Sequence, residues 1–533
     1  MHPERGASQP GNSCRAALLL GMLLVVLSAA VCIPAARAAV GSYALSDPVP
    51  YLLIGPKVTT DPNLLAQGGR VVKGVAADGV SEMVIAVSAA SVGQQFTFQI
   101  YNDQGQASTS VPQDGGLGMP GASYTQFGQS QVTVAAVATS SAGPMAFAVY
   151  RAPLDFARPG GADDSLAQRS VSVHWSISGT STSGTIPVVV LRPPVMLVHG
   201  LWGSPADWDD FQPLATNNPK INDARFAVAR ANYDKAVSHI ASSTPSWSWY
   251  DGFSIKANAL GYVYNARTVI DQISSFVNTF KTGSNPASIP VAAVEVDVVA
   301  HSMGGDVTRT MPLVLGFGSD TTFGQGSVHK LITVDTPHLG SPLATGLLTS
   351  NNTCLRDVFN AAGMYSFTSV TTNSGRKITG AIGGLSGDGT GGGLSPALKA
   401  LQPSSNVPLQ IPHLLPTAYL VGAMGPTQLD GLNNPGAFVD GLRALCSKDP
   451  LAQGLTASKW PTVMGGPSDA IVPVSSENNE SAPYSQVTSI HSAGTEDLGF
   501  KGPGALQSVT GNPQNAINLL NTWIANSVFV GLR

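Results

Sequence analysis

A serine with small neighbours follows an apolar, strand-like run in this 533-residue chain. Residues 298–305 read Val-Val-Ala-His-Ser-Met-Gly-Gly, so that Ala300 and Gly304 stand two positions before and after Ser302. A strand, a sharp turn that bears a serine and a following helix form a nucleophile elbow, and those two positions must then be small. We therefore predict that Ser302 is a nucleophile that forms a covalent acyl intermediate.

A serine nucleophile needs an imidazole as its base and a carboxylate that orients the imidazole. Where the serine lies on such an elbow, the chain order is serine, acid, histidine. Of the histidines after Ser302, only His491 lies near the C-terminus, and small, turn-like residues follow it. Asp469 precedes it in Ser-Asp-Ala-Ile-Val-Pro. We predict His491 as the base and Asp469 as the acid.

Other titratable groups downstream of Ser302 receive lesser roles. Asp430 and Asp440 are fallback acids, and His338 and His413 are expected to be structural.

A second glycine-rich turn follows the apolar run Val195–Val198, with the sequence His-Gly-Leu-Trp-Gly. In an elbow-type hydrolase, the loop after this strand and the residue after the nucleophile each supply one amide to the oxyanion hole. We assign these amides to Leu201 and Met303. His199 is expected to stabilise the turn and not to transfer protons.

Four motifs together carry a resemblance to a known family: VHGLWGS, AHSMGG, VDTPHLGSP and SDAIVPVSS, in this order. From about residue 194 onward the chain resembles the α/β-hydrolase superfamily, specifically its bacterial triacylglycerol lipases and lipase-like esterases. The resemblance implies the same roles for Ser302, Asp469, His491 and the two amides. It implies that the segment beginning at Asp335 shapes the wall beside the nucleophile, and it implies neither a cofactor nor a catalytic metal.

The pattern of apolar residues divides the chain at about residue 191. Before this point, short alternating runs separated by turns predict an antiparallel, Ig-like β-sandwich at 39–190; the expected strands are Gln95–Tyr101, 132–137, 145–150, 170–177 and 186–191. From 191 to 533, apolar runs alternate with helical stretches, which predicts a mainly parallel sheet with helices on both faces. One helix is expected at 258–280, with Ala259, Val263, Ala266, Val269 and Ile270 on its apolar side, and another after Asn512.

The first 38 residues are typical of an export signal. Arg5 and Arg15 precede an uncharged apolar stretch, and Ala-Arg-Ala at 36–38 fits a cleavage site; an uncleaved membrane anchor is the alternative. Cleavage would remove Cys14 and Cys32 and leave Cys354 and Cys446 either as one disulfide or as two free thiols.

Two long insertions, at about 202–254 and 342–416, fit neither strands nor helices and are typical of caps or lids. Trp202, Trp247 and Trp249 could line an acyl-chain site, with ordinary packing as the alternative. The second insertion contains the glycine run 383–393, for which a solvated, partly disordered stretch is an equal alternative.

Composition excludes several other functions. A net charge of −4 with only 11% charged residues gives no electrostatic basis for binding nucleic acid.

We expect a secreted serine hydrolase that cleaves carboxylic esters, first of all acylglycerols. The alternatives are a short-chain carboxylesterase, an extracellular polyester depolymerase whose N-terminal domain contacts the polymer surface, and an inactive envelope-associated binding protein on a hydrolase scaffold. Sequence leaves the oligomeric state and any structural cation open.

Overall fold

The computed structural model describes residues 39–122, 128–201, 203–211, 223–233, 261–349, 354, 367–371, 377–381, 396–403, 411–430, 437–479, 484–491, 496–497, 500–501 and 503–506. The expected export signal, Trp202, Trp247, Trp249, the glycine run 383–393 and the expected helix after Asn512 lie outside these residues. In the described part of the chain, no helix is both long and apolar enough to cross a bilayer.

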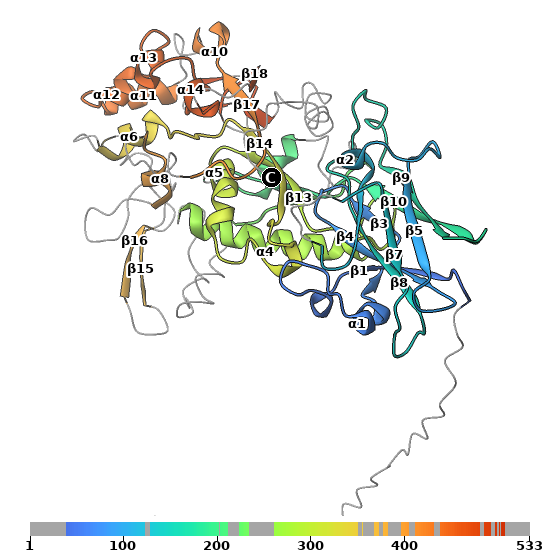
Figure 1. Cartoon of the computed structure of the whole chain (residues 1–533). Coiled ribbons are helices and arrows are strands. Elements are labelled where there is room, and N and C mark those ends of the chain that lie inside the picture. Colours follow the sequence, from blue (N-terminus) through green and yellow to red (C-terminus); the bar gives the residue numbers. More distant parts are fainter. Residues whose placement is uncertain are drawn as a thin grey trace, which may run out of the picture.

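The first half of the chain forms two packed five-stranded sheets (Figure 1). One sheet has the order β2-β1-β4-β8-β6, and its strands are β1 Tyr43–Asp47, β2 Arg70–Val71, β4 Glu82–Ser88, β6 Gly116–Gly118 and β8 Met145–Arg151. The other has the order β3-β10-β9-β5-β7, with β3 Gly74–Ala76, β5 Gln95–Tyr101, β7 Gln131–Ala135, β9 Gln168–Ile177 and β10 Ser183–Leu191. Neighbouring strands are antiparallel, except that β3 runs parallel to β10.

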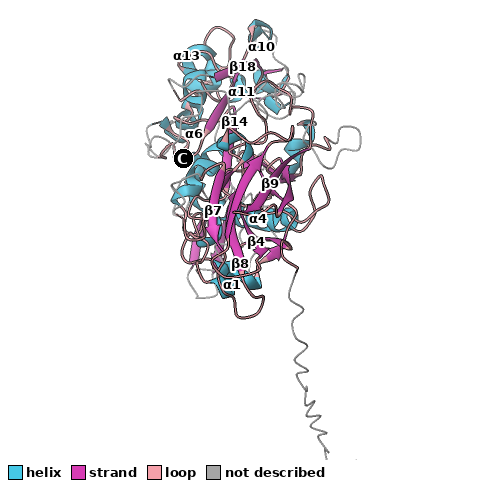
Figure 2. Cartoon of the chain, turned by 45° about the vertical axis from the view of Figure 1, so that its right-hand side comes forward, coloured by secondary structure: helices cyan, strands magenta, loops and turns pink. Residues whose placement is uncertain are grey.

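Alternation of apolar and polar residues explains why these segments form a sandwich. In β5, Phe96, Phe98 and Ile100 are buried while their neighbours face outward. In β9, Trp175 takes the same inward direction, and its ring lies 5.8 Å from that of Phe96. The strands of this sandwich lie side by side in Figure 2, and its predicted class is confirmed.

The second half contains a six-stranded sheet in the order β12-β11-β13-β14-β17-β18. Its strands are β11 Val195–Val198, β12 Val228–Arg230, β13 Val296–His301, β14 Val328–Val334, β17 Thr417–Ala423 and β18 Tyr484–Thr488. Every neighbouring pair is parallel. The central strands are buried on both faces, as their continuous apolar runs require. The predicted parallel α/β architecture is therefore confirmed.

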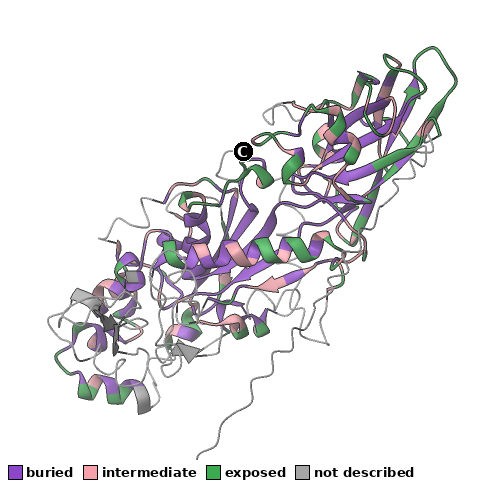
Figure 3. Cartoon of the chain, turned by 90° about the horizontal axis from the view of Figure 1, so that it is seen from below, coloured by how far each residue is buried: buried purple, intermediate pink, exposed green. Residues whose placement is uncertain are grey.

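One face of this sheet is covered by α4 (Tyr262–Lys281) and α5 (Met303–Thr310). Ala266, Val269 and Ile270 are buried on α4 as predicted, and the helix alternates between buried and exposed residues (Figure 3). Val263 was predicted on the apolar side, which is wrong: it is 59% exposed, because the buried stripe begins at Tyr262 and continues past Ile270 to Ile273. Ala259 lies outside the described residues.

The opposite face carries a separate apolar cluster. Trp208 in the 3-10 helix η2 (Pro205–Asp210), with Phe211 and Phe226, packs against Leu197 and Val299 of the sheet. Ala505 and Leu506 complete the cover.

Shorter elements complete the described part of the chain. These are η1 Pro50–Leu52, α1 Pro62–Gln67, α2 Val111–Asp114, η5 Met311–Leu313, η6 Asp320–Thr322, α6 Pro342–Thr349, β15 Phe367–Thr371, β16 Lys377–Ala381, α8 Pro396–Ala400, α10 Pro426–Asp430, α11 Ala437–Leu445, α12 Pro450–Gly454, α13 Trp460–Met464, α14 Val474–Glu477, β19 Glu496–Asp497 and β20 Phe500–Lys501.

Buried polar groups join the sandwich to the base of the parallel sheet. Asp78 is fully buried, and one of its oxygens accepts hydrogen bonds from the amides of Val294 and Glu295 at 2.9 and 3.2 Å. On the next strand, Lys330 forms a buried ion pair with Asp155 of the sandwich. Because β13 begins directly after Glu295, the sandwich fixes the strand that leads to Ser302.

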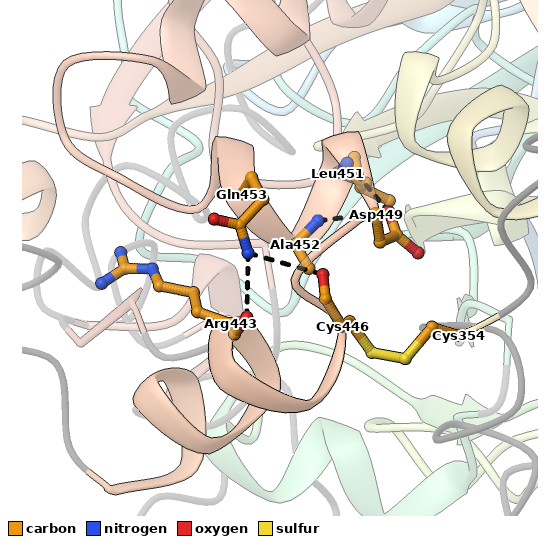
Figure 4. Close-up of a disulfide and its surroundings, with 7 residues drawn as sticks. All are labelled: Cys354, Arg443, Cys446, Asp449, Leu451, Ala452 and Gln453. Carbon is orange, nitrogen blue, oxygen red and sulfur yellow. Dashed lines mark hydrogen bonds between the residues drawn. A yellow bond between two sulfur atoms is a disulfide. The ribbon is translucent and has the colours of Figure 1, made fainter.

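A disulfide joins Cys354 to Cys446, with the two Cα atoms 5.5 Å apart (Figure 4). Cys446 directly follows α11, and the side-chain amide of Gln453 donates to the carbonyls of Arg443 and Cys446 at 2.9 and 3.4 Å. Asp449 caps α12 beside it.

We expect replacement of both cysteines by alanine to lower the free energy of unfolding, because the bridge closes a loop with a sequence separation of 92. On the chain-entropy model this constraint contributes at most about 4–5 kcal/mol. Urea denaturation with and without reductant measures the effect. Reductant should destabilise the wild type but not the double variant, and a wild type that is indifferent to reductant contradicts the prediction.

Candidate active site

Ser302 occupies a strained turn between β13 and α5. Its backbone has φ 55° and ψ −135°, an unusual conformation for a residue other than glycine. Such a conformation costs on the order of 1–3 kcal/mol and persists only when the surrounding structure enforces it. Ser302 directly follows β13, at the carboxyl end of the parallel sheet, and is buried with 8% of its surface exposed.

Close packing explains the small residues around the turn. A Cβ atom at Gly304 would lie 2.5 Å from the carbonyl oxygen of Val198 and 2.6 Å from that of His199. A Cβ atom at Gly200 would lie 2.6 Å from Cβ of Ser302 and 3.0 Å from its Oγ. The turn after β11 and the serine turn are therefore in direct contact, which places the backbone of Gly200 beside the hydroxyl.

We expect Gly200→Ala to lower ester turnover by about 10–100-fold, since the added methyl group must displace Ser302 and small displacements of reacting groups are costly. Gly441→Ala is the matched control, because this glycine is exposed on α11 and a Cβ there meets nothing within 4 Å. The control should keep full turnover, measured with a chromogenic ester. Wild-type turnover in Gly200→Ala would show that the contact does not constrain the serine.

Two further residues lie beside the hydroxyl at the same edge of the sheet. His491 follows β18, and Asp469 lies in the segment between β17 and β18. Nε2 of His491 is 2.8 Å from Oγ of Ser302, and Nδ1 of His491 is 2.5 Å from Oδ2 of Asp469. Carboxyl ends of neighbouring parallel strands meet at one edge, so residues distant in the chain converge there.

The hydrogen bonds assign the proton positions. Asp469 is fully buried, and its Oδ1 already accepts from the amides of Ile471 and Val472 at 2.9 and 2.7 Å. Oδ2 must then accept from Nδ1 of His491, so Nδ1 carries the proton and Nε2 is free to accept one from the serine. The amide of His491 also donates to the carbonyl of Asp469 at 2.8 Å, which fixes the two backbones together.

His301 is a further site residue that sequence reasoning did not single out. Its Nε2 donates to the carbonyl oxygen of His491 at 2.8 Å. Burial, followed by the neighbouring His491, lowers the pKa of His301 to about 3. His301 is therefore neutral at ordinary pH and holds the loop that bears His491. Its position directly before Ser302 was the available signal.

Three buried carboxyl groups meet behind His491. Asp335, which follows β14, and Glu477 on α14 join Asp469 there, and the exposed fractions of Asp335, Glu477 and Asp469 are 0%, 1% and 0%. Sequence analysis placed Asp335 in the wall beside the nucleophile and did not consider Glu477. Desolvation and the proximity of Asp469 raise the pKa of both additional carboxyls well above their ordinary values.

Among the described residues, one group brings three metal-ligand atoms within 4.8 Å of one another: Asp335, Asp469 and His491. The short contact between His491 and Asp469 requires a proton on Nδ1, and a protonated nitrogen cannot ligate a metal. We therefore interpret the group as a hydrogen-bonded assembly.

Three further histidines make contacts outside the site of Ser302: His338, His413 and His199. His338 is fully buried and accepts from Arg309 at 2.7 Å, and burial lowers its pKa well below the ordinary value. His413 accepts from Asn479 at 2.8 Å, and burial lowers its pKa as well. His199 stacks on the Tyr233 ring at 4.0 Å, within the turn after β11.

Neither fallback acid lies where an acid is needed. Asp430 is exposed at the end of α10, and Asp440 is exposed on α11, 3.5 Å from Arg443. Asp469 takes the position beside His491. Met303, whose amide was assigned to the oxyanion hole, begins α5 directly after the serine.

The parallel sheet, the serine on a strand-to-helix turn and the later acid and histidine define an α/β-hydrolase fold, as the sequence resemblance predicted. Residues 192–377 match the family model described as PGAP1-like alpha/beta domain, which begins where the parallel sheet begins. No curated protein matches the sequence.

Solved structures similar to this chain include a lipase from Bacillus licheniformis, BlEst2. In its mature form it has 16% identity and a TM-score of 0.32, over 62% of this chain and 92% of that chain. In its propeptide form the values are 17% and 0.31, over 62% and 50%. Phospholipase PlaB from Legionella pneumophila has 12% identity and a TM-score of 0.32, over 62% of this chain and 58% of that chain. Similarity at this level defines neither substrate nor mechanism.

Proposed function

We propose that this protein is a secreted serine hydrolase that cleaves carboxylic esters, with acylglycerols as the preferred substrates. One observation carries the proposal: the hydroxyl of Ser302, the imidazole of His491 and the carboxylate of Asp469 form a continuous hydrogen-bonded series of 2.8 and 2.5 Å. The disulfide supports secretion, because such bonds persist mainly in oxidising compartments.

In the proposed reaction, Ser302 attacks the ester carbonyl carbon while Nε2 of His491 takes the serine proton. The amides of Leu201 and Met303 stabilise the oxyanion, and each such donor contributes roughly 3–4 kcal/mol to stabilising the transition state. His491 then protonates the departing alcohol. Water, activated by the same imidazole, hydrolyses the acyl-enzyme and restores the serine.

A series of p-nitrophenyl esters from acetate to palmitate, alongside emulsified triacylglycerol, tests the substrate class. An acylglycerol lipase should hydrolyse the emulsion and retain activity on long acyl chains. Activity confined to the acetate and butyrate esters would assign the protein to the short-chain carboxylesterases. Hydrolysis of polyester granules but not of triacylglycerol would assign it to the depolymerases. Absence of turnover on every ester would leave the inactive binding protein as the function.

A further inference from the structure

Asp335 has no role in the reaction described above, yet it lies beside the residues that perform it. One oxygen of Asp335 lies within 4.8 Å of ligand atoms of both Asp469 and His491. Its backbone has φ 51°, an unusual conformation for a non-glycine residue. The packing around the site therefore enforces the position of this carboxyl.

Space for the carboxyl comes from a missing side chain on the neighbouring strand. A Cβ atom at Gly422 of β17 would lie 2.4 Å from Oδ2 of Asp335 and 2.6 Å from Oγ of Ser489. Glu477 accepts a hydrogen bond from the Gly422 amide at 2.7 Å, so it lies against the same glycine. Asp335 is thus enclosed by β17, by α14 and by the segment from Ser489 to His491.

Three ionised carboxylates at this position would have too little positive charge beside them. Among the described residues, His491 is the one basic group that forms an ion pair with the cluster, and it pairs with Asp469. Asp469 also accepts two amide hydrogen bonds, so it is better supplied with hydrogen-bond donors than Asp335. Neither oxygen of Asp335 accepts a well-formed hydrogen bond from a described residue, although the Ser489 hydroxyl lies near it. A buried carboxylate so poorly supplied with donors is strongly destabilised, whereas a protonated carboxyl can itself donate.

We propose that Asp335 is a positioning residue of the active site: it remains protonated and donates a hydrogen bond to the Asp469 carboxylate, which holds Asp469 against His491. This inference rests on the proposed hydrolase function. The pKa of Asp335 agrees with it, since burial and the Asp469 charge raise that pKa well above the ordinary value. The groups that face Asp335 are Asp469, His491, Ser489 and Glu477.

Two substitutions at position 335 test the hydrogen bond to Asp469 while leaving the backbone conformation unchanged. Asparagine and glycine both tolerate a φ of 51°, but only asparagine keeps a donor at the position of the carboxyl hydroxyl. Asp335→Asn should keep kcat for a p-nitrophenyl ester within about threefold of the wild type, because a neutral donor replaces a neutral donor. Asp335→Gly should lower kcat by about 10–100-fold with KM unchanged, because Asp469 loses its support. Circular dichroism establishes that each variant is folded.

The pH profile of kcat/KM distinguishes a proton-bearing Asp335 from an ionised one. The acidic limb reports protonation of the base, and removing a neutral group should leave its midpoint unchanged in Asp335→Asn. A shift of the midpoint to lower pH by about one unit would show that a negative charge had been removed and would overturn the proposal. Equal losses in the two variants, or full activity in Asp335→Gly, would overturn it as well. If Asp335→Gly does not fold, the pH profile of Asp335→Asn alone decides.

Failure of the proposed function has a different signature. A folded wild type that hydrolyses no ester refutes both proposals. An active wild type with a shifted acidic limb in Asp335→Asn refutes only the role of Asp335.

Discussion

Ser302→Ala should lower kcat for ester hydrolysis by at least about 10⁴-fold, since no other group supplies the nucleophile and residual catalysis comes only from binding and the oxyanion hole. Structurally, the substitution removes one oxygen atom at the end of β13 and leaves the fold intact. Initial rates with p-nitrophenyl butyrate, measured at enzyme concentrations high enough to detect slow turnover, provide the test.

Ser302→Gly is the companion variant. It should be equally inactive but more stable than Ser302→Ala, because glycine adopts the φ of 55° without strain; the gain is about 1 kcal/mol in the free energy of unfolding. Turnover above about one per cent of the wild-type rate in either variant would remove Ser302 from the mechanism.

His491→Ala and Asp469→Asn should each lower kcat by about 10³–10⁴-fold or more. The first substitution removes the imidazole whose Nε2 lies 2.8 Å from the serine hydroxyl and would take its proton. With asparagine at 469, the side-chain amide can donate to Nδ1 and so favour the tautomer whose Nε2 carries the proton. That nitrogen can no longer accept the serine proton.

The ranking among the acids is part of this prediction. Asp335→Asn should be far milder than Asp469→Asn, although the two carboxyls are close together. A larger loss in Asp335→Asn than in Asp469→Asn would exchange the roles of the two acids.

The double variant Ser302→Ala/His491→Ala should be no slower than Ser302→Ala, because the two residues act as a unit.

Local sequence patterns were sufficient to predict the residues that now lie together. Ser302 was identified because a nucleophile elbow imposes small residues at fixed offsets, and the structure shows the backbone contacts that exclude a Cβ atom at Gly304. Asp469 and His491 followed from chain order. The alternation in β5 and β9 likewise predicted the sandwich.

Features that depend on contacts between distant segments were not predictable in the same way. β18 has polar, mostly exposed side chains at the edge of the sheet, so its hydrophobic pattern gave no signal. The cluster of Asp335, Asp469 and Glu477 arises only when three segments pack together beside Gly422, and no local spacing reveals it. Asp78 was missed for the same reason, because its partners lie 216 and 217 positions further along the chain.

Covalent labelling with a fluorophosphonate, followed by peptide mass spectrometry, tests the central claim most directly. The probe reacts with a serine only when a neighbouring base activates it. We expect one adduct on the wild-type protein, located on Ser302, with strongly slowed labelling in His491→Ala. An adduct on another residue, or ester turnover by a protein that takes up no label at Ser302, would contradict the proposed active site.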